Sequence, residues 1–237
     1  MIYETIVVPD ATREPRGWAE ACREAGEVLR EGGLLVHPTS TVYGIGGAAT
    51  AEVDAEVSRI KGRPASWSLI RLAADIRTLR ASVEGAVWSA SADALAREFW
   101  PGPLTLVLDD GSAAGIAVRV DGHPFARAVA AALGGLMSST SLNLSGRPPT
   151  ADPAVARRTL GTMPKGHARV LFTDAGPLPS RGSSTIVSLR EEVPRLIREG
   201  AVTAAQIESC LGTAVVAGAV DAVRDDGTRP PEGGGAR

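Results

Sequence analysis

The fold is decided near the N-terminus by residues 34–46, which read LLVHPTSTVYGIG. The first four residues form a short apolar run that stops at Pro38, which predicts a strand followed by a loop. Upstream, apolar residues recur at helical spacing over residues 18–29 and are followed by Gly32-Gly33, so a helix is expected before this strand. The loop carries three hydroxyl residues and two glycines. These groups could present hydroxyls and N–H groups to an anionic ligand, and a plain polar turn is the alternative.

Strand and helix signals alternate along the rest of the chain. Apolar runs predict further strands at residues 3–8, 69–72, 104–108, 116–120, 136–140, 170–172, 185–189 and 195–197. Helices are predicted after an N-cap at Thr50, over residues 92–99, from Pro124 to about 134, from Asp152-Pro153 onward, and from a capping box of Thr203 with Gln206 to Gly212. Several strands follow one another without a helix between them. This order favours an α/β fold with a twisted, mixed sheet and helices packed on it.

Composition narrows the class of protein further. The chain has 237 residues, enough for one large domain with a substantial core. Aromatic residues are only 4%, so the core must rely on aliphatic side chains, which suits a sheet covered by helices. The formal net charge of -2 shows no basic excess of the kind that nucleic-acid-binding proteins carry. Direct binding of nucleic acid is therefore expected to be weak or absent.

Location and domain limits also follow from simple features. Cys22 and Cys210 are isolated thiols, typical of small buried hydrophobes in a reducing compartment. No apolar run reaches the ~18 residues of a membrane span, and the N-terminus lacks the apolar segment of a secretory signal. We expect a cytoplasmic protein without a membrane association. Its folded domain is predicted at residues 1–212, followed by a largely disordered tail at 213–237 that ends in DDGTRPPEGGGAR.

Cationic and hydroxyl-rich segments stand at the ends of these predicted elements. Lys61 and Arg63 at a helix end could contact phosphates, or they could simply complement the helix dipole. Arg119 interrupts an apolar strand and suits a carboxylate ligand if it points inward, or water if it points outward. Other polar runs are SSTSLNLSG at 138–146, SSTIV at 183–187 and IREG at 197–200, whereas FWPGPLT at 99–105 predicts a rigid structural turn.

Each of these segments is a weak signal alone, but their order is specific. The series PT-x-T-VYG, K-x-RP, FWPGPLT, VRV, STS-x-N-x-SG, STIV and IR-x-G resembles the YrdC-like family of threonylcarbamoyl-adenylate synthases. The match covers roughly residues 30–212. The paired K-x-R and S-x-N elements of that family are present here as Lys61/Arg63 and Ser141/Asn143.

The resemblance implies a fold, a reaction and partners. Members of the family are twisted α/β proteins with a large concave cavity. They take L-threonine, bicarbonate or CO2, and ATP, release pyrophosphate, and yield L-threonylcarbamoyl-AMP, which makes them nucleotidyltransferases. A separate complex then transfers the threonylcarbamoyl group to tRNA. ATP is expected as a substrate and Mg²⁺ with it, and the chain resembles the short, single-domain form.

The resemblance also implies roles for individual residues. Lys61 and Arg63 are expected to be catalytic, because cations that neutralise phosphates stabilise the transition state. The expected ATP-binding residues are Lys61, Arg63, Ser141, Asn143, Thr150 and Arg198. The expected threonine-binding residues are Thr39, Thr41, Arg119, Ser141 and Ser184, with Arg119 taking the carboxylate. No metal ligand is predicted, and His37, His123 and His167 are interpreted as structural or surface residues.

The chain departs from the family pattern at several positions, among them Ser68-Leu69, where the family usually has Pro-Leu. Ser40 stands where the family often has an acidic residue, Leu72 where many members have a threonine-contacting histidine, Asp121 where they have proline, and Leu142 where they have alanine. Two alternatives to the synthase remain open. One is a relative that forms carbamoyl-adenylate from carbamoyl phosphate. The other is a non-catalytic RNA-binding protein on the same fold, which the scarcity of aromatic residues for base stacking disfavours.

Overall fold

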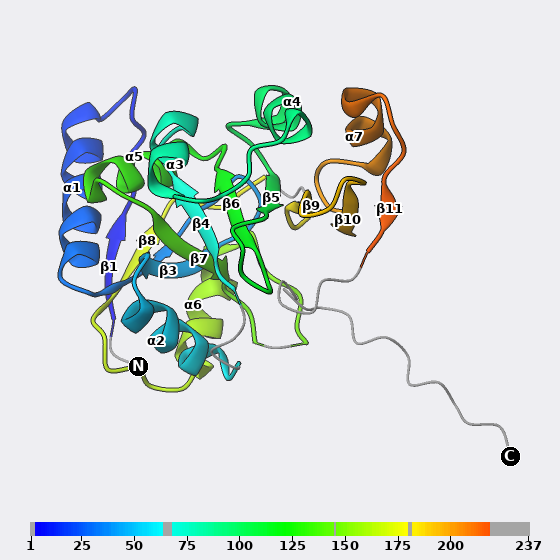
Figure 1. Ribbon diagram of the computed structural model, residues 1–237. Coiled ribbons are helices and arrows are strands. Elements are labelled where there is room, and N and C mark those ends of the chain that lie inside the picture. Colours follow the sequence, from blue (N-terminus) through cyan, green and yellow to red (C-terminus); the bar gives the residue numbers. More distant parts are fainter. Residues whose placement is uncertain (1–2, 64–67, 145, 180–181, 219–237) are drawn as a thin grey trace, which may run out of the picture.

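A computed structural model describes residues 3–63, 68–144, 146–179 and 182–218 (Figure 1). The helices are α1 (Pro15–Arg30), α2 (Ala51–Lys61), α3 (Ile76–Ser82), α4 (Ala90–Phe99), α5 (Pro124–Leu133), α6 (Pro153–Thr162) and α7 (Ala204–Leu211). The strands are β1 (Glu4–Val7), β2 (Leu34–His37), β3 (Gly44–Ala48), β4 (Ile70–Ala73), β5 (Leu104–Leu108), β6 (Ile116–Val120), β7 (Met137–Ser141), β8 (Val170–Asp174), β9 (Thr185–Ser188), β10 (Arg195–Arg198) and β11 (Val216–Ala217).

The strands of the described residues form one sheet in the order β1-β8-β2-β3-β7-β4-β6-β5-β9-β10-β11. Five of the neighbouring pairs are parallel and five antiparallel, for example β4 with β6 and β3 with β7. The sheet is therefore mixed, and helices pack on it (Figure 1). The predicted fold class is confirmed.

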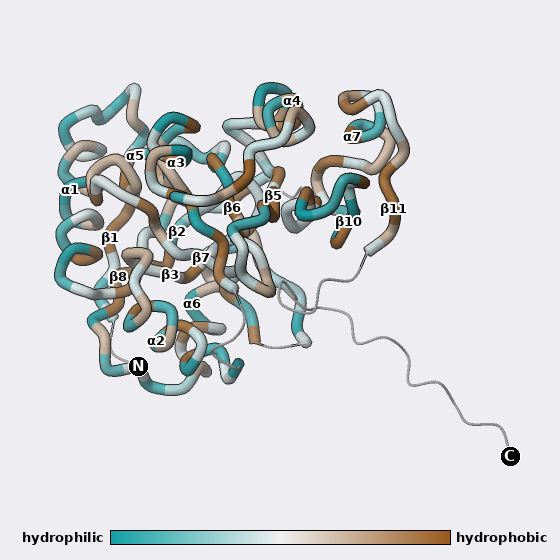
Figure 2. The backbone as a smooth tube through the Cα atoms, viewed as in Figure 1, coloured by the Kyte–Doolittle hydropathy of each residue, from teal (hydrophilic) through white to brown (hydrophobic). Residues whose placement is uncertain are grey.

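Helices cover both faces of the sheet. α1 and α5 pack on the face that carries Leu35, Leu72 and Met137, which we call the α1 face. Successive residues of a strand point to opposite faces, so Leu34 and Val36 lie on the other side, packed with residues of α2 and α6. On that same side, α3, α4 and α7 cover β5, β6 and β9. The turns of α1 alternate between hydrophilic and hydrophobic colours in Figure 2, as expected for a helix with one buried face.

Local sequence explains where the helices begin and end. The side chain of Thr50 accepts a hydrogen bond from the Val53 N–H and caps α2, which ends at Gly62 in the left-handed conformation. The capping box predicted for the last helix is present, with Thr203 and Gln206 bonded reciprocally. Asp75 caps the short α3, which the sequence interpretation did not predict. None of the described helices combines the length and apolar character that a bilayer span requires.

One stretch differs from its prediction and a second agrees with it. Residues 38–46 were expected to be a loop, but Gly44 already begins β3, so the loop is shorter. The strand predicted at 136–140 is present as β7, so residues 138–141 of the polar run at 138–146 lie within a strand. Their side chains are buried on both faces of the sheet. The hydroxyl groups of this run are therefore fixed by strand geometry.

The sheet extends past residue 212, where the domain boundary is predicted. β11 pairs in parallel with β10, through Val216 opposite Arg195 and Ala217 opposite Leu196. The sheet therefore includes part of the segment predicted as a disordered tail. The rest of that segment, residues 219–237, lies outside the described residues, and the prediction for it stays a prediction.

Candidate functional site

A cavity opens on the α1 face, over the centre of the sheet. Strand register places its residues: Gly44 lies opposite Ser141, Ile70 opposite Ser139, and Leu72 opposite Arg119. Paired residues point to the same face, so these strands present hydroxyls, a guanidinium and two aliphatic side chains together. The lining residues are Thr39, Thr41, Val42, Gly44, Ile70, Leu72, Arg119, Ser139, Thr140, Ser141, Ser183, Ser184 and Arg198.

Lys61 lies beside this cavity, at the C-terminal end of α2. Its ammonium group is buried and donates hydrogen bonds to the backbone oxygen of Ser141 at 2.5 Å and to Oδ1 of Asn143 at 2.8 Å. The Ser141 hydroxyl also donates to Oδ1 of Asn143, whose Nδ2 donates to the backbone oxygen of Arg147 at 2.7 Å. The predicted K-x-R and S-x-N elements thus meet through direct contacts.

Arg63 follows Lys61 by two residues and stands at the same end of α2. Its backbone N–H donates to the carbonyl of Ser58 at 2.9 Å, which completes the turn at Gly62. The chain therefore presents two cationic residues where the helix ends, as the motif predicts.

The loop between β2 and β3 is organised by a threonine hydroxyl. Oγ1 of Thr39 donates to the carbonyl of Val42 at 2.6 Å and accepts from the N–H groups of Thr41 at 3.2 Å and Val42 at 3.1 Å. It also lies 3.0 Å from Oγ1 of Thr41. Both threonines line the cavity. The loop is therefore a defined turn that carries hydroxyl groups. A polar turn and an anion-binding loop, the two interpretations that the sequence left open, are compatible with each other.

Arg119 points inward and is 3% exposed. Its Nε donates to the carbonyl of Gly102 at 2.9 Å, an Nη2 hydrogen bond reaches Oγ of Ser40 at 2.8 Å, and the guanidinium forms an ion pair with Asp121. Burial lowers the pKa of Arg119, and the nearby Asp121 carboxylate opposes that effect. The inward orientation required for a carboxylate ligand is present, and a buried carboxylate of the chain itself already contacts the guanidinium.

The opposite wall of the cavity is held by β9 and β10. Nε of Arg198 donates to the backbone oxygen of Ser184 at 3.0 Å, and its Nη2 donates to the Ser184 hydroxyl at 3.0 Å. Oγ1 of Thr105 on β5 lies 3.3 Å from the same hydroxyl. Ser184 and Arg198, which are distant in sequence from the threonine loop, thus belong to the same cavity.

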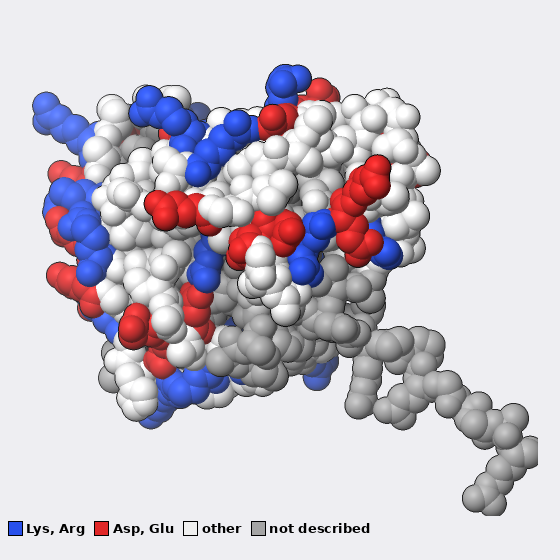
Figure 3. Space-filling view, in the orientation of Figure 1, with Lys and Arg blue, Asp and Glu red and all other residues white. Residues whose placement is uncertain are grey.

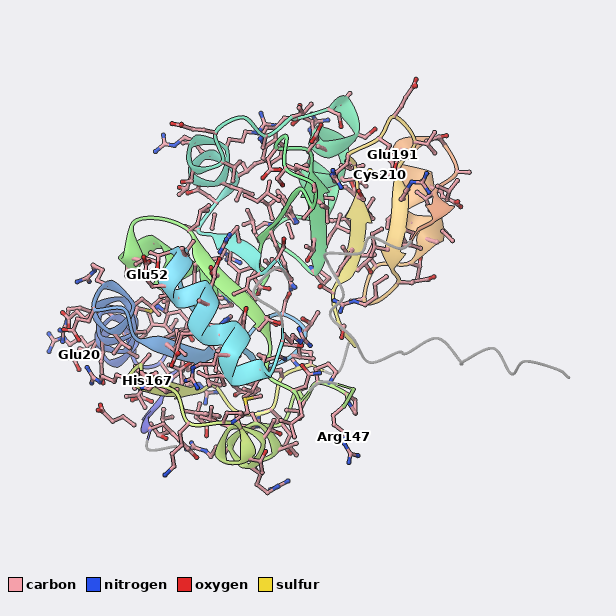
Figure 4. All side chains as sticks on the ribbon, turned by 60° about the horizontal axis from the view of Figure 1, so that its bottom comes forward. Glu20, Glu52, Arg147, His167, Glu191 and Cys210 are labelled. Atoms are coloured by element: carbon pink, nitrogen blue, oxygen red, sulfur yellow. The ribbon has the colours of Figure 1, made fainter. Side chains whose placement is uncertain are left out.

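Thr150, like Lys61, Arg63 and Asn143, is a predicted site residue outside the cavity lining. Its carbonyl accepts a hydrogen bond from the Tyr43 N–H at 2.8 Å, and its hydroxyl accepts from the Asp152 N–H at 3.0 Å near the start of α6. It does not belong to the residues that line the cavity. The nearby Arg147 side chain points away from the body of the protein (Figure 4).

Histidines and metal-ligating side chains contribute little to this cavity. His37 is fully buried, with Nε2 3.1 Å from the hydroxyl of Ser139, and burial lowers the pKa of His37 to about 4. His123 accepts from the N–H of Phe125 and caps α5. His167 is exposed. Among the described residues, no group of three or more His, Cys, Asp or Glu side chains could hold a metal ion.

Sequence reasoning missed several participants. Ser139, Thr140, Ile70 and Ser183 line the cavity, and the Gly102 carbonyl and the Asp121 carboxylate hold Arg119. Their contacts depend on which strands are neighbours. The available signal for Asp121 was its charge directly after an apolar strand that contains Arg119.

The sequence of this chain is similar to that of known proteins. The family model Sua5/YciO/YrdC, described as "Telomere recombination", matches residues 27–200, well over half of the chain. The chain belongs to this family. A putative threonylcarbamoyl-AMP synthase of Mycobacterium tuberculosis H37Rv is 35% identical over 221 residues, which cover 88% of this chain and 95% of the relative. The threonylcarbamoyl-AMP synthase of Bacillus subtilis is 34% identical over 80% of this chain and 56% of its own length.

A family member of known structure has the same fold. The crystal structure of Pyrococcus abyssi Sua5 complexed with L-threonine superposes with a TM-score of 0.73 at 27% identity, over 91% of this chain and 62% of that one. Escherichia coli YciO, at 24% identity, gives a TM-score of 0.68 over 84% of this chain and 95% of its own. Membership of the family, predicted from motif order, is confirmed.

Proposed function

We propose that this protein is an L-threonylcarbamoyladenylate synthase. The observation that carries the proposal is the placement of three cationic side chains around one hydroxyl-rich cavity. Arg119 and Arg198 line the cavity, and Lys61 is bonded to Ser141, which also lines it. A reaction between two anionic reactants needs this kind of fixed positive charge. The names of the relatives support the same activity.

The proposed reaction joins three small molecules. The amine of L-threonine adds to CO2 and loses a proton to give a carbamate. A carbamate oxygen then attacks the α-phosphorus of ATP; the new O–P bond forms as the bond to the β-phosphate oxygen breaks, and pyrophosphate leaves. Every bond is made between substrate atoms, so the protein needs no nucleophile of its own. Its contribution is to bring the reactants together and to stabilise negative charge.

The predicted site residues divide between two ends of the site. Arg119 takes the threonine carboxylate, with Thr39, Thr41, Ser141 and Ser184 around the amino acid. The phosphates of ATP lie near Lys61 and Arg63, and the ATP-binding residues further include Asn143, Arg198 and Thr150. Thr150 lies near the start of α6, so we assign it to the outer portion of the nucleotide.

Magnesium belongs with the nucleotide in this proposal. Mg²⁺ is commonly held by substrate phosphates with few protein carboxylates. Asp121, next to the cavity, is already ion-paired with Arg119, so the described residues offer no set of protein ligands. We therefore assign the ion to the ATP phosphates.

The product of this reaction is a precursor for the modification of tRNA. Threonylcarbamoyl-AMP is a mixed anhydride whose acyl group must pass to an amine, which a downstream transferase complex would supply on tRNA. A small-molecule site of this kind needs no nucleic-acid surface. On the face drawn in Figure 3, basic and acidic residues are interspersed, as expected if tRNA binds to the transferase complex and not to this protein. The place of action is then the cytoplasm.

The test is a reaction analysed by mass spectrometry. The full chain is incubated with ATP, Mg²⁺ and bicarbonate, with L-threonine, with L-valine as a near-isostere lacking the hydroxyl, or with no amino acid. A threonine-dependent peak of threonylcarbamoyl-AMP with equimolar pyrophosphate is the expected result. Carbamoyl-AMP formed only when carbamoyl phosphate is supplied would replace the proposal with the second enzyme. Absence of turnover together with tight RNA binding would favour the non-catalytic alternative.

A further inference from the structure

The Asp121 carboxylate is buried behind the amino-acid end of the cavity, directly after β6. It is 1% exposed. Its Oδ1 accepts hydrogen bonds from the N–H groups of Ser40 at 2.9 Å and His123 at 2.6 Å. Its Oδ2 belongs to the ion pair with Arg119 and lies 3.5 Å from the Ser40 hydroxyl. One carboxylate therefore joins the loop after β2, the end of β6 and the start of α5.

Arg119 depends on these neighbours for its orientation. A buried guanidinium is costly unless it is paired and hydrogen-bonded. Its contacts come from three separate segments: the Gly102 carbonyl, the Ser40 hydroxyl and the Asp121 carboxylate. Because the guanidinium is planar and its donors are fixed, these contacts set the direction in which its remaining edge faces the cavity.

Ser40 connects the same carboxylate to the two threonines of the loop. It stands between Thr39 and Thr41, which line the cavity together with Arg119. Its backbone N–H is bonded to Asp121. Asp121 itself does not belong to the lining, so it reaches the ligand only through other residues.

We propose that Asp121 is a positioning residue for the amino-acid substrate, a role that rests on the proposed function. It fixes the Thr39–Thr41 loop and the Arg119 guanidinium relative to each other, so that both meet the threonine carboxylate and amine in one geometry. A carboxylate is required because every group around it is a donor: two N–H groups, a guanidinium and a hydroxyl. An amide of the same shape would turn its NH2 group toward one of these donors.

Residue 40 is a second position from which a carboxylate can reach the Arg119 guanidinium. Oγ of Ser40 lies 2.8 Å from Nη2 of Arg119, so its Cβ is directed toward the same guanidinium. A carboxylate introduced by Ser40→Asp can therefore renew the ion pair when the one at 121 is removed. It cannot renew the bond from the His123 N–H, so recovery should be partial.

The experiment uses the full chain and measures threonine and ATP separately. Asp121→Asn and Asp121→Ala should each raise the KM for L-threonine at least tenfold, while the KM for ATP changes less than threefold. Ser40→Asp in the Asp121→Ala background should lower the threonine KM again by at least threefold. Ser40→Ala, which keeps the N–H bond and loses only the hydroxyl, should raise it by less than Asp121→Asn does.

A second Asp–Arg ion pair, outside the cavity, provides the control. Asp54 on α2 pairs with Arg71 of β4 at 2.6 Å. Arg71 points to the opposite sheet face from its neighbours Ile70 and Leu72, which line the cavity. Asp54→Asn should lower the melting temperature without changing either KM. If Asp121→Asn behaves in the same way, or raises both KM values equally, Asp121 is merely structural and the inference is overturned.

Calorimetric titration with L-threonine separates this inference from the proposed function, because it needs no turnover. A wild-type protein that binds L-threonine but makes no adenylate contradicts the function and leaves Asp121 testable by affinity. Weaker threonine binding in Asp121→Asn, at an unchanged melting profile, then supports the positioning role. A wild-type protein that does not bind L-threonine overturns both.

Discussion

The ammonium group of Lys61 lies 2.8 Å from Oδ1 of Asn143 and 2.5 Å from the backbone oxygen of Ser141. These contacts join the end of α2 to the end of β7, two segments that are distant in the chain. The ammonium is buried, so its charge is held against fixed oxygens. A cation in such surroundings acts more strongly on a nearby anion than one in bulk water.

We expect Lys61→Met to weaken ATP binding at least tenfold. Methionine keeps most of the length of the side chain but removes the charge, and it leaves the oxygens of Ser141 and Asn143 without this donor. Isothermal titration with ATP measures the effect. Lys165 is the other lysine of the chain and is exposed, so Lys165→Met is the matched control and should bind ATP normally. Equal affinities for the two variants would contradict a role for Lys61.

The buried His37 predicts a pH-dependent stability. Burial lowers the pKa of His37 to about 4 from its ordinary value of 6.5, while the bond with the Pro38 carbonyl opposes this effect. The unfolded chain then binds more protons at this position than the folded chain between about pH 6.5 and pH 4. The free energy of unfolding therefore falls as the pH drops through this window, by about 2 kcal/mol at pH 5 from this residue alone.

Chemical denaturation at pH 7.5 and pH 5 measures this contribution. The loss of unfolding free energy between the two pH values should be smaller in His37→Gln than in the wild-type protein by about 2 kcal/mol. His167 is exposed, so His167→Gln serves as the control and should keep the wild-type dependence. The same pH dependence in all three proteins would show that His37 does not titrate in this window.

The sequence predicted most elements because their signals are local. Apolar periodicity and caps such as Thr50 and Thr203 act within a few residues of one another. β3 was missed because GIGGA at 44–48 has a low intrinsic preference for a strand. Its glycines are required by a neighbour that the local sequence does not reveal. A Cβ at Gly46 would lie 1.7 Å from the carbonyl oxygen of Ser138 on β7.

Gly46 is closely packed and Gly161 is not, so alanine at these two positions should have opposite effects on stability. Gly46→Ala must force β3 and β7 apart and should destabilise the protein by about 3 kcal/mol, the upper end of the usual cost of overpacking. Gly161 lies within α6, and a Cβ there would meet nothing within 4 Å. Gly161→Ala should stabilise the protein by up to about 1 kcal/mol, because alanine favours a helix. Thermal melting of both variants tests the pair, and a stable Gly46→Ala protein would contradict the register of β3 with β7.

The candidate site was predictable only in part, for a related reason. The resemblance in motif order predicted roles for Lys61, Asn143, Arg119 and Arg198, and these roles stay predictions. The groups that hold Arg119 were not predictable, because the Gly102 carbonyl and Ser40 reach it only through strand order and loop geometry. Sequence patterns indicate which residues carry charge, whereas packing decides which of them meet.

Arg198 gives the most selective test of the nucleotide side. Its guanidinium makes two hydrogen bonds to Ser184, from Nε to the backbone oxygen and from Nη2 to the hydroxyl. Lysine keeps the charge but cannot reproduce this fork, so Arg198→Lys should raise the KM for ATP by roughly ten- to a hundredfold, as expected from the loss of about 1.5–3 kcal/mol in a charge-assisted hydrogen bond. Arg195 lies on the same strand, pairs with the exposed Glu191 at 2.8 Å, and stands away from the cavity lining. Arg195→Lys is therefore the matched control and should leave the KM unchanged. A normal KM for ATP in Arg198→Lys, measured by pyrophosphate release, would mean that positive charge alone suffices at this position and that the two-point contact with Ser184 does not orient the nucleotide.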